Sequence, residues 1–243
     1  MIIFNIIWSA PEIRKVIRND RSLRIMFNED SWMGRTDEGR KPVQRRSQAR
    51  VDAILAVATH LLIERGTDGL VMRDIARRAN VQIGSLYQYF PNKAAVLKGL
   101  GERFNKRFEA CLFEAWQRCM QDRSTLAQAV DQTVDAAFEF YLEEPGFPAL
   151  WAGFQSEPGL SQLDRDDTLH NAGFFAASIS ARYPGLDGQH MLTIGVLMCE
   201  AAGSALRFAV HAEEPMRSDV IRALKQLIVL QLEALVAGQA AKP

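Results

Sequence analysis

The chain has 243 residues, 48% of them hydrophobic and 24% charged, with a formal net charge of zero, so it can bury a substantial core in one or two compact domains. Three cysteines and the lack of alternating strand-like runs exclude a disulfide scaffold and favour a reduced, mostly helical, cytoplasmic protein. No apolar run approaches the ~20 residues that span a bilayer, and the first eight residues lack a basic start and a cleavage site, so neither a membrane anchor nor secretion is expected.

Charge is distributed unevenly along the chain. Residues 40–107 contain 14 Lys and Arg and 5 Asp and Glu, whereas residues 108–243 contain 9 and 18. Residues 1–39 are balanced, with 6 of each sign. Charged runs usually form solvated helix faces, which accounts for the acidic half. The basic excess instead predicts a cationic module that attracts nucleic-acid phosphates, joined to an acidic body that repels them.

Residues 1–45 are predicted to be a poorly structured extension that ends in a basic arm. This arm could follow a DNA backbone or enter the adjacent minor groove. The alternative is a tail that serves solubility. The basic residues of the arm, on either side of Pro42, are Arg40, Lys41, Arg45 and Arg46.

A long helix is predicted to begin at Ser47 and to end at Gly66. Apolar residues recur along it at helical spacing and define one buried face. The helix is expected to support the segment that follows it. The buried face comprises Val51, Ile54, Leu55, Ala58, Leu61 and Leu62.

Residues 71–90 are typical of a helix-turn-helix. The first helix carries apolar residues at helical spacing, with arginines on its other faces. Asn80 follows it directly, and Asn readily adopts the left-handed conformation that ends a helix, so the chain can reverse there. The second helix, from Ile83 to Tyr89, buries Leu86 and is too short to be stable alone.

The outward residues of that second helix have the character of a recognition helix, which enters the DNA major groove by its polar N-terminal end. After Pro91, Asn92 is a good N-cap for a third helix, and the Lys93 ammonium at its first position can reach a phosphate. This third helix is predicted to continue toward Trp116 as a long connector. The candidate DNA-binding residues are Arg45, Arg46, Arg73, Gln82, Ile83, Gly84, Ser85, Tyr87, Gln88, Tyr89 and Lys93.

Four elements stand here in one fixed register: Ile75-Ala76, Asn80-Val81, Gly84-Ser85-Leu86-Tyr87-Gln88-Tyr89-Phe90 and Asn92-Lys93. The pattern resembles the N-terminal signature of TetR-type transcriptional regulators, the tetracycline-repressor family, over residues 46–107. The alternative is an ordinary three-helix cluster with a coincidental aromatic run. The resemblance implies a three-helix DNA-binding domain at 46–107, with its motif at 71–90 and Lys93 on a phosphate.

The resemblance also implies a helical ligand-sensing and dimerisation domain at residues 108–243. Val71 and Gln82 depart from the family pattern, because both stand where it usually places a helix-capping hydroxyl residue. Asn80 replaces the usual turn Gly, a change that the backbone tolerates. Met33 looks like the natural start of such a regulator, and the alternative is a genuine amphipathic extension over residues 1–32.

From Ser124 onward the pattern predicts a helical bundle. Pro-Gly pairs or single prolines separate the helices. The expected helices cover residues 125–143, 147–156, 160–183, 189–211 and 216–237.

The last two helices are the most apolar of the bundle. Small residues on the first of them allow another helix to approach closely, and aliphatic residues form a stripe on the second. The residues could belong to the core of one subunit. The resemblance instead implies a four-helix interface with a second subunit, as a palindromic operator requires. The candidate interface residues are Gly195, Ala202, Ile221, Leu224, Ile228 and Leu232.

An aromatic concentration between the connector and the last two helices is a candidate pocket for an apolar ligand. Such side chains are more often plain core. Glu200 and Arg207 interrupt an apolar run on one helical face, so they are expected to pair with each other, across a dimer, or with an effector. The candidate pocket residues are Phe138, Tyr141, Trp151, Phe154, Phe174, Glu200 and Arg207.

The sequence therefore predicts an all-α, homodimeric repressor that binds a double-stranded DNA operator and is released by a small apolar or amphipathic effector. Alternatives are an architectural DNA-binding protein without effector control and a helical enzyme. The four histidines are scattered, and Asp166 with His170 is expected to be a surface ion pair. No catalytic residue, cofactor or metal is predicted, because no nucleophile elbow, phosphate loop or dinucleotide glycine motif occurs.

Overall fold

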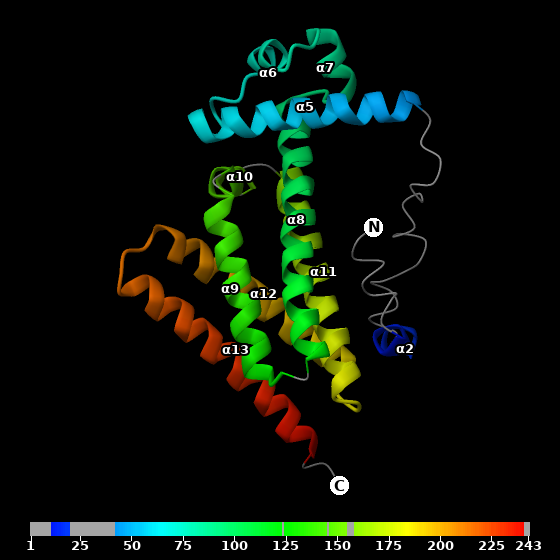
Figure 1. Ribbon diagram of the computed structural model, residues 1–243, viewed down its shortest axis with the longest axis vertical. Helices are drawn as coiled ribbons and strands as arrows, with labels where there is room; N and C mark the ends of the chain where they lie inside the picture. The colour runs from blue at the N-terminus through cyan, green and yellow to red at the C-terminus, as the bar shows by residue number, and fades with distance from the viewer. Residues whose placement is uncertain (1–10, 20–41, 123, 145, 155–157, 241–243) are drawn as a thin grey trace. The chain divides into compact units, whose positions relative to one another are not determined.

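A computed structural model describes residues 11–19, 42–122, 124–144, 146–154 and 158–240, and these ranges contain helices and turns without a strand (Figure 1). The all-α prediction is confirmed. The helices are α2 (Pro11–Asn19), α5 (Pro42–Arg65), α6 (Met72–Arg78), α7 (Ile83–Tyr89), α8 (Lys93–Gln121), α9 (Leu126–Glu143), α10 (Gly146–Phe154), α11 (Pro158–Arg182), α12 (Gly188–His211) and α13 (Met216–Ala240).

The described helices form two compact units. The N-terminal unit contains α5, α6, α7, α8 up to Lys106, α10, and α11 up to Arg165. The C-terminal unit contains α2, α8 from Arg107, α9, α11 from Asp166, α12 and α13. The division within α8 lies beside the predicted boundary at residue 107. The segment 144–165, which follows the predicted boundary in sequence, groups in space with the N-terminal unit.

The core of the N-terminal unit forms on one face of α5. The apolar stripe predicted for this helix is buried except for half-exposed Val51, and Ile54, Ala58 and Leu61 are fully inaccessible. Helices α6 and α7 lie on one side of α5 (Figure 1). They contribute few side chains to the core, and the first turns of α8 contribute more. The buried residues from these three helices are Ile75, Ala76, Leu86, Val96, Leu97, Leu100 and Phe104.

Helix α10 joins the N-terminal unit because its first residue is a glycine. A Cβ on Gly146 would lie 3.2 Å from both Thr59 of α5 and Phe104 of α8, so a larger residue would crowd this contact. Phe147 then packs edge-on against Phe104, with 6.0 Å between ring centroids. This close approach explains why the segment groups with the helices that precede it in sequence.

The N-terminal extension differs from its prediction in two places. Helix α5 begins at Pro42, so Arg45 and Arg46 are helical and do not form a poorly structured arm. Proline favours the first turn of a helix, where its missing N–H costs no hydrogen bond. Helix α2 is amphipathic, with Ile13 and Ile17 buried, as in the alternative of an amphipathic extension. Met33 lies outside the described residues.

The core of the C-terminal unit is a seam between α8 and α11. Phe113 stacks on Phe174, with 3.6 Å between ring centroids, and both side chains are fully buried. About one turn further along, the Trp116 indole donates a hydrogen bond to Ser178 Oγ at 2.7 Å. Because successive contacts advance in the same direction on both helices, α8 and α11 run parallel. The seam begins with the buried pair Glu109 and His170, and near its other end Arg182 contacts Met120.

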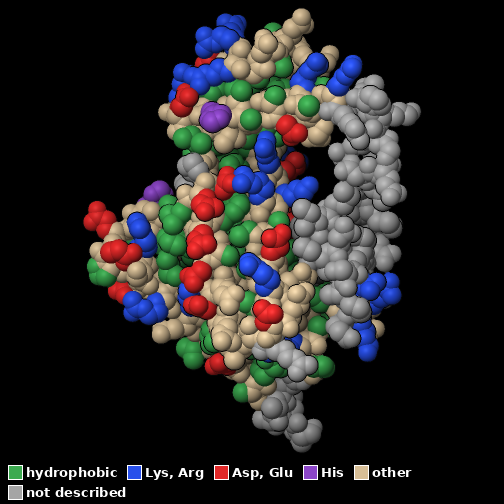
Figure 2. Space-filling view, viewed as in Figure 1, with side chains coloured by type: hydrophobic (Ala, Val, Ile, Leu, Met, Phe, Trp, Pro, Cys, Tyr) green, Lys and Arg blue, Asp and Glu red, His purple; other side chains and the backbone are tan. Residues whose placement is uncertain are grey.

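Helices α9 and α13 complete this unit around α8 and α12. On α9, Asp131, Asp135, Glu139 and Glu143 repeat every four residues and form an acidic stripe, visible in Figure 2 as a line of red side chains. Lys225 of α13 bonds Asp131 Oδ1 at 2.6 Å and lies 2.7 Å from Asp135 Oδ1. Burial alone would lower the pKa of Lys225, but these two hydrogen bonds outweigh it and raise the pKa.

Replacing Lys225 tests this clamp between α9 and α13. The change Lys225→Ala should lower the free energy of unfolding by about 1 kcal/mol, because two neighbouring carboxylates lose their shared cation. The melting temperature should fall by about 2–4 °C. Arg222→Ala is the control, because Arg222 pairs only one turn away with Asp219 on its own exposed helix face. Thermal unfolding followed by circular dichroism would contradict the clamp if both variants melted alike.

Candidate nucleic-acid interface

Helix α7 presents nearly all of its side chains to solvent. Its fully buried residue is Leu86, which anchors the helix to the core. Ile83 and Tyr87 are 43% and 47% exposed, although apolar and aromatic side chains of this size usually find a partner. Gln82 and Gln88 are exposed as well, and Ser85 is half-buried. Such a helix offers hydrogen-bonding and apolar groups together, as contacts with base edges require.

The turn between α6 and α7 has the predicted backbone. Asn80 has a φ of 52°, the left-handed conformation that reverses the chain after α6. Val71 and Gln82, at the N-caps of α6 and α7, make no side-chain capping bond, as their side chains predict. Asn92 does cap α8, since its Oδ1 accepts a hydrogen bond from the Ala95 amide at 2.8 Å. Lys93 is therefore the first residue of α8, as predicted.

Tyr89 has a structural role in addition to its predicted contact with DNA. Its hydroxyl accepts a hydrogen bond from Ser47 Oγ of α5 at 3.3 Å, and the side chain is only half-exposed. Tyr89 therefore holds the C-terminal end of α7 against α5. Of the predicted contact residues on α7, it is the one with a packing role.

Arginines gather on the surface that α5, α6 and α7 form, as Figure 2 shows. Arg46 and Arg73 are exposed and make no ion pair within the described residues, so they are available to phosphates. Arg77 and Arg78 are different, because Asp74 and Glu64 bind them at 3.0 and 2.9 Å. The Arg45 side chain is not among the side chains that the structure describes.

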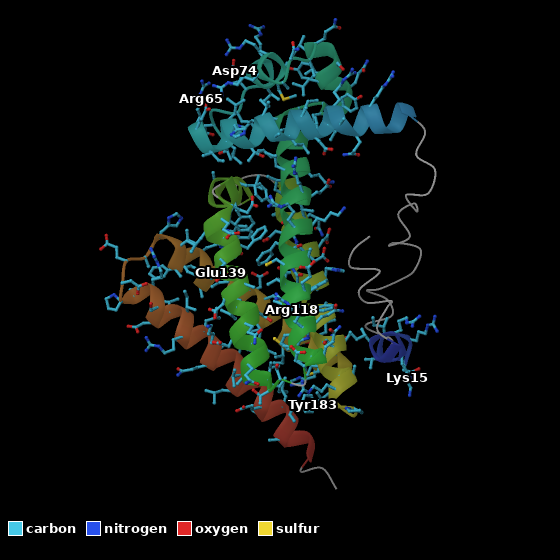
Figure 3. The ribbon with its side chains drawn as sticks, viewed as in Figure 1. Lys15, Arg65, Asp74, Arg118, Glu139 and Tyr183 are labelled. Atoms are coloured by element: carbon cyan, nitrogen blue, oxygen red, sulfur yellow. The ribbon has the colours of Figure 1, made fainter. Side chains whose placement is uncertain are left out.

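Sequence reasoning missed the carboxylates in this network. Glu64 and Arg65 end α5, and Asp74 lies in the first turn of α6 (Figure 3). The sequence did contain a sign of these ion pairs. Two charged residues stand at the end of one predicted helix, and charged residues of both signs stand on the next. Only the fold shows which of these charges meet, since the partners are 9 and 14 residues apart in sequence.

The predicted pocket residues are divided between the two compact units. Phe138, Tyr141 and Phe174 belong to the C-terminal unit, whereas Trp151 belongs to the N-terminal unit. Phe174 is fully buried against Phe113. The side chain of Phe154 lies outside the described side chains.

Two charged candidates of the pocket are also placed differently. Glu200 is exposed in the single chain and accepts a hydrogen bond from Thr168 at 2.9 Å, so it is not paired with Arg207. Arg207 donates to Ser204 on its own helix at 3.1 Å and lies against Gly203. Glu200 and Arg207 therefore serve separate contacts.

His170 corrects another expectation. It is 6% exposed and pairs with Glu109 of α8, which is 7% exposed, so it is not in a surface pair with Asp166. Glu109 precedes buried Leu112, Phe113 and Trp116 by three, four and seven residues, so its helical register was a sign of burial, whereas its partner, 61 residues away, was not predictable. The C-terminal unit thus has a pair of ionisable side chains inside an aromatic core. Within the described residues, no three His, Cys, Asp or Glu side chains could hold a metal ion.

The candidate interface residues on α12 and α13 fall into three groups. Leu224 and Leu232 are each 6% exposed, so they belong to the subunit's own core. Gly195 allows α12 to approach α11, because a Cβ there would lie 3.0 Å from the Ala172 carbonyl oxygen. The remaining candidates, Ala202, Ile221 and Ile228, are half-exposed.

This geometry defines a helical DNA-binding protein of the helix-turn-helix class. The model of the TetR family of bacterial regulatory proteins matches residues 54–100, and a tetracycline-repressor-like C-terminal domain model matches residues 124–236. Together the two models match well over half of the chain. The chain belongs to the TetR family of transcriptional regulators.

Individual relatives agree with this assignment. The chain is 33% identical over 75 residues to the HTH-type transcriptional repressor KstR of Mycolicibacterium smegmatis, a segment that makes up 30% of this chain and 35% of that protein. The matching segment thus spans about a third of the relative. Two crystal structures share the fold: a TetR-family regulator from Streptomyces coelicolor (TM-score 0.59, 21% identity, 78% of this chain and 98% of that one) and a TetR-family regulator described as putative from Shewanella sp. PV-4 (TM-score 0.56, 23% identity, 74% and 95%).

Gly84 provides a test of the interface. Within the described residues, a Cβ on Gly84 would meet nothing within 4 Å, so packing does not require glycine. Glycine in a helix costs about 1 kcal/mol relative to alanine, yet it lets a DNA backbone approach closely. Gly84→Ala should therefore raise the melting temperature and weaken DNA binding. Calorimetry and a mobility-shift assay would check both signs, and unchanged DNA affinity would remove Gly84 from the interface.

Proposed function

We propose that the chain is a cytoplasmic repressor that binds a palindromic DNA operator as a homodimer and is released by a small apolar or amphipathic effector. The observation that carries this proposal is the exposed face of α7, where Ile83, Tyr87 and Gln88 point to solvent around a single buried leucine. Exposed cations on α5 and α6 flank this face and supply phosphate contacts. Base contacts from α7 would then select the sequence.

The homodimer is supported by an apolar surface on α12 and α13. Leu197 and Phe208 of α12 are 58% and 56% exposed, and Leu227 and Leu230 of α13 are 49% and 67% exposed. Among the described helices, α12 alone has the length and composition of a membrane-spanning helix, although its apolar stretch also contains Glu200 and Arg207. A second copy of the chain would cover this surface. The two recognition helices of the dimer would then read the two halves of a palindrome.

Effector control is supported by the composition of the C-terminal unit. Aromatic side chains line the seam between α8 and α11, and the buried pair Glu109 and His170 lies among them. An apolar molecule with one polar group is the chemistry that such surroundings accept. Both helices of the seam continue from one unit into the other, so a change at the seam has a direct path along the chain.

Selection of duplexes from randomised DNA tests the operator first. The wild-type protein should enrich a palindromic sequence. Small apolar and amphipathic compounds are then screened for release of that duplex in a mobility-shift assay. A protein that enriches no sequence would contradict the proposal, and one that enriches a sequence but is released by no compound would favour control by other means.

Salt dependence provides a sharper prediction for the phosphate contacts. Specific affinity should fall steeply between low and physiological salt, because bound cations displace counterions from DNA. Lys93→Ala should weaken all sequences alike and reduce the slope of log affinity against log salt by about 1 for each half-site. Lys98→Ala is the control, since Lys98 lies on the same helix and faces Glu102 at 3.9 Å. Equal effects of the two changes would remove Lys93 from the interface.

The dimer interface is tested at its most exposed apolar residue. Leu230→Glu should place an unpaired charge between the subunits, at a cost of about 2 kcal/mol or more, and shift the protein to monomer. The helical content should stay unchanged, because Leu230 has no buried role in one chain. Leu142→Glu is the control, since Leu142 of α9 is 49% exposed outside this surface. Light scattering that found the Leu230 variant still dimeric would exclude this face.

A further inference from the structure

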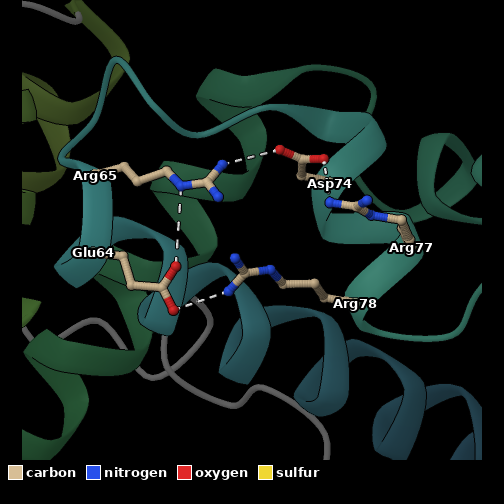
Figure 4. A network of polar contacts seen from close by, with 5 residues as sticks. All are labelled: Glu64, Arg65, Asp74, Arg77 and Arg78. Carbon is tan, nitrogen blue, oxygen red and sulfur yellow. Dashed lines mark hydrogen bonds and ion pairs between the residues drawn. The ribbon is translucent and has the colours of Figure 1, made fainter.

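Five charged residues connect the end of α5 to α6 (Figure 4). Arg65 Nη1 lies 3.2 Å from Asp74 Oδ2, and Arg78 Nη1 lies 2.9 Å from Glu64 Oε1. Asp74 also binds Arg77 Nη2 at 3.0 Å through its other oxygen, and Arg65 lies 4.0 Å from Glu64. The network contains three guanidinium groups and two carboxylates, and it lies within the N-terminal unit.

The two links between the helices attach α6 at both ends. Asp74 stands in the first turn of α6 and Arg78 is its last residue, so the attachment points are four residues apart on one helix face. Helix α6 is only seven residues long, and Val71 gives it no side-chain cap. A helix this short has little stability of its own, so its orientation depends on what holds it. Burial of Ile75 and Ala76 fixes its depth, whereas the two ion pairs restrict its rotation on α5.

The turn before α6 supports the same arrangement. Gly66 adopts a φ of 65° and ends α5. A Cβ on Gly69 would lie 2.3 Å from the Cβ of Arg65, so the returning chain passes directly over that residue. The backbone thus presses against the base of the Arg65 side chain whose guanidinium reaches Asp74.

The link between Glu64 and Arg78 is a true ion pair. The hydrogen bond from Arg78 lowers the pKa of the Glu64 carboxyl, and the same bond raises the pKa of Arg78. Both partners therefore remain charged at neutral pH. Their contribution is lost only in acid, as the pH falls through the lowered pKa of Glu64.

We propose that Glu64 and Asp74 are positioning residues for DNA binding: by tying both ends of α6 to the last turn of α5, they set the orientation in which α7 enters the groove. Helix α7 follows α6 after a four-residue turn, and the two helices pack on each other. A rotation of α6 therefore moves α7 with it. The carboxylates would do this although their negative charge opposes DNA binding.

Positioning and electrostatics therefore predict opposite effects on specific DNA affinity when a carboxylate is removed, and this difference tests the proposal. Glu64→Gln and Asp74→Asn each remove one negative charge close to the DNA, so long-range electrostatics alone would tighten binding to every duplex. If the carboxylates position α6, specific binding should instead weaken by about threefold or more while non-specific binding stays equal or becomes tighter. The ratio of specific to non-specific affinity separates the two effects.

The probes are the duplex that wild-type protein selects from randomised DNA and a scrambled duplex of equal length. Glu102→Gln is the matched control, because Glu102 is an exposed carboxylate of the same unit that pairs one turn away with Lys98 on its own helix. It makes the same charge change without touching the link. Circular dichroism would establish that each variant keeps its helices.

A charge exchange completes the experiment. The double variant Glu64→Arg with Arg78→Glu restores one ion pair with its direction reversed, so it should recover specificity that Arg78→Glu alone loses. The proposal is overturned if Glu64→Gln and Asp74→Asn bind the selected duplex as tightly as wild type. It is also overturned if Glu102→Gln loses the same specificity, or if the exchange restores none.

Discussion

A helix of seven residues is not stable alone in water, and the DNA-binding unit contains two of them, α6 and α7. The arrangement of the other helices in this unit follows from the need to support these two. Neither α6 nor α7 has a side-chain N-cap. Both therefore take their stability from the rest of the unit: buried Ile75 and Leu86 fix them to its core, and the Ser47–Tyr89 hydrogen bond and the ion pairs at the end of α5 attach them to α5. Helix α5 is long because it is the platform on which two unstable helices are positioned.

The C-terminal unit is instead built from long helices. Helices α8 and α11 are long and run parallel, and their contacts repeat about every turn from the buried Glu109–His170 pair through stacked rings to an indole hydrogen bond. A parallel pair needs a return path, which α9 and α10 provide between them. The polar pair at the start of the seam is costly to bury and so limits which partners the two helices can accept there.

The sequence predicted what depends on local pattern. The helix order, the stripe on α5, the left-handed Asn80, the missing caps and the start of α8 at Lys93 all follow from residue type and spacing. Contacts across long separations were not predictable. Glu109 with His170 and the assignment of Gly146 to the N-terminal unit depend on the fold, and periodicity could not tell which side of α13 meets α9, so Leu224 was expected in an interface.

Because few residues of α7 are buried, selection for folding and selection for DNA binding act on different residues of this helix. Folding constrains mainly Leu86, together with the end that Tyr89 ties down, and leaves the solvent-facing positions without a structural duty. Substitutions at Gln82, Ile83, Tyr87 or Gln88 therefore have almost no stability cost to overcome before they are tested by function. After gene duplication, a copy of this chain could acquire a new target sequence through a few changes on one helix, while the machinery that folds and supports that helix remained as it was.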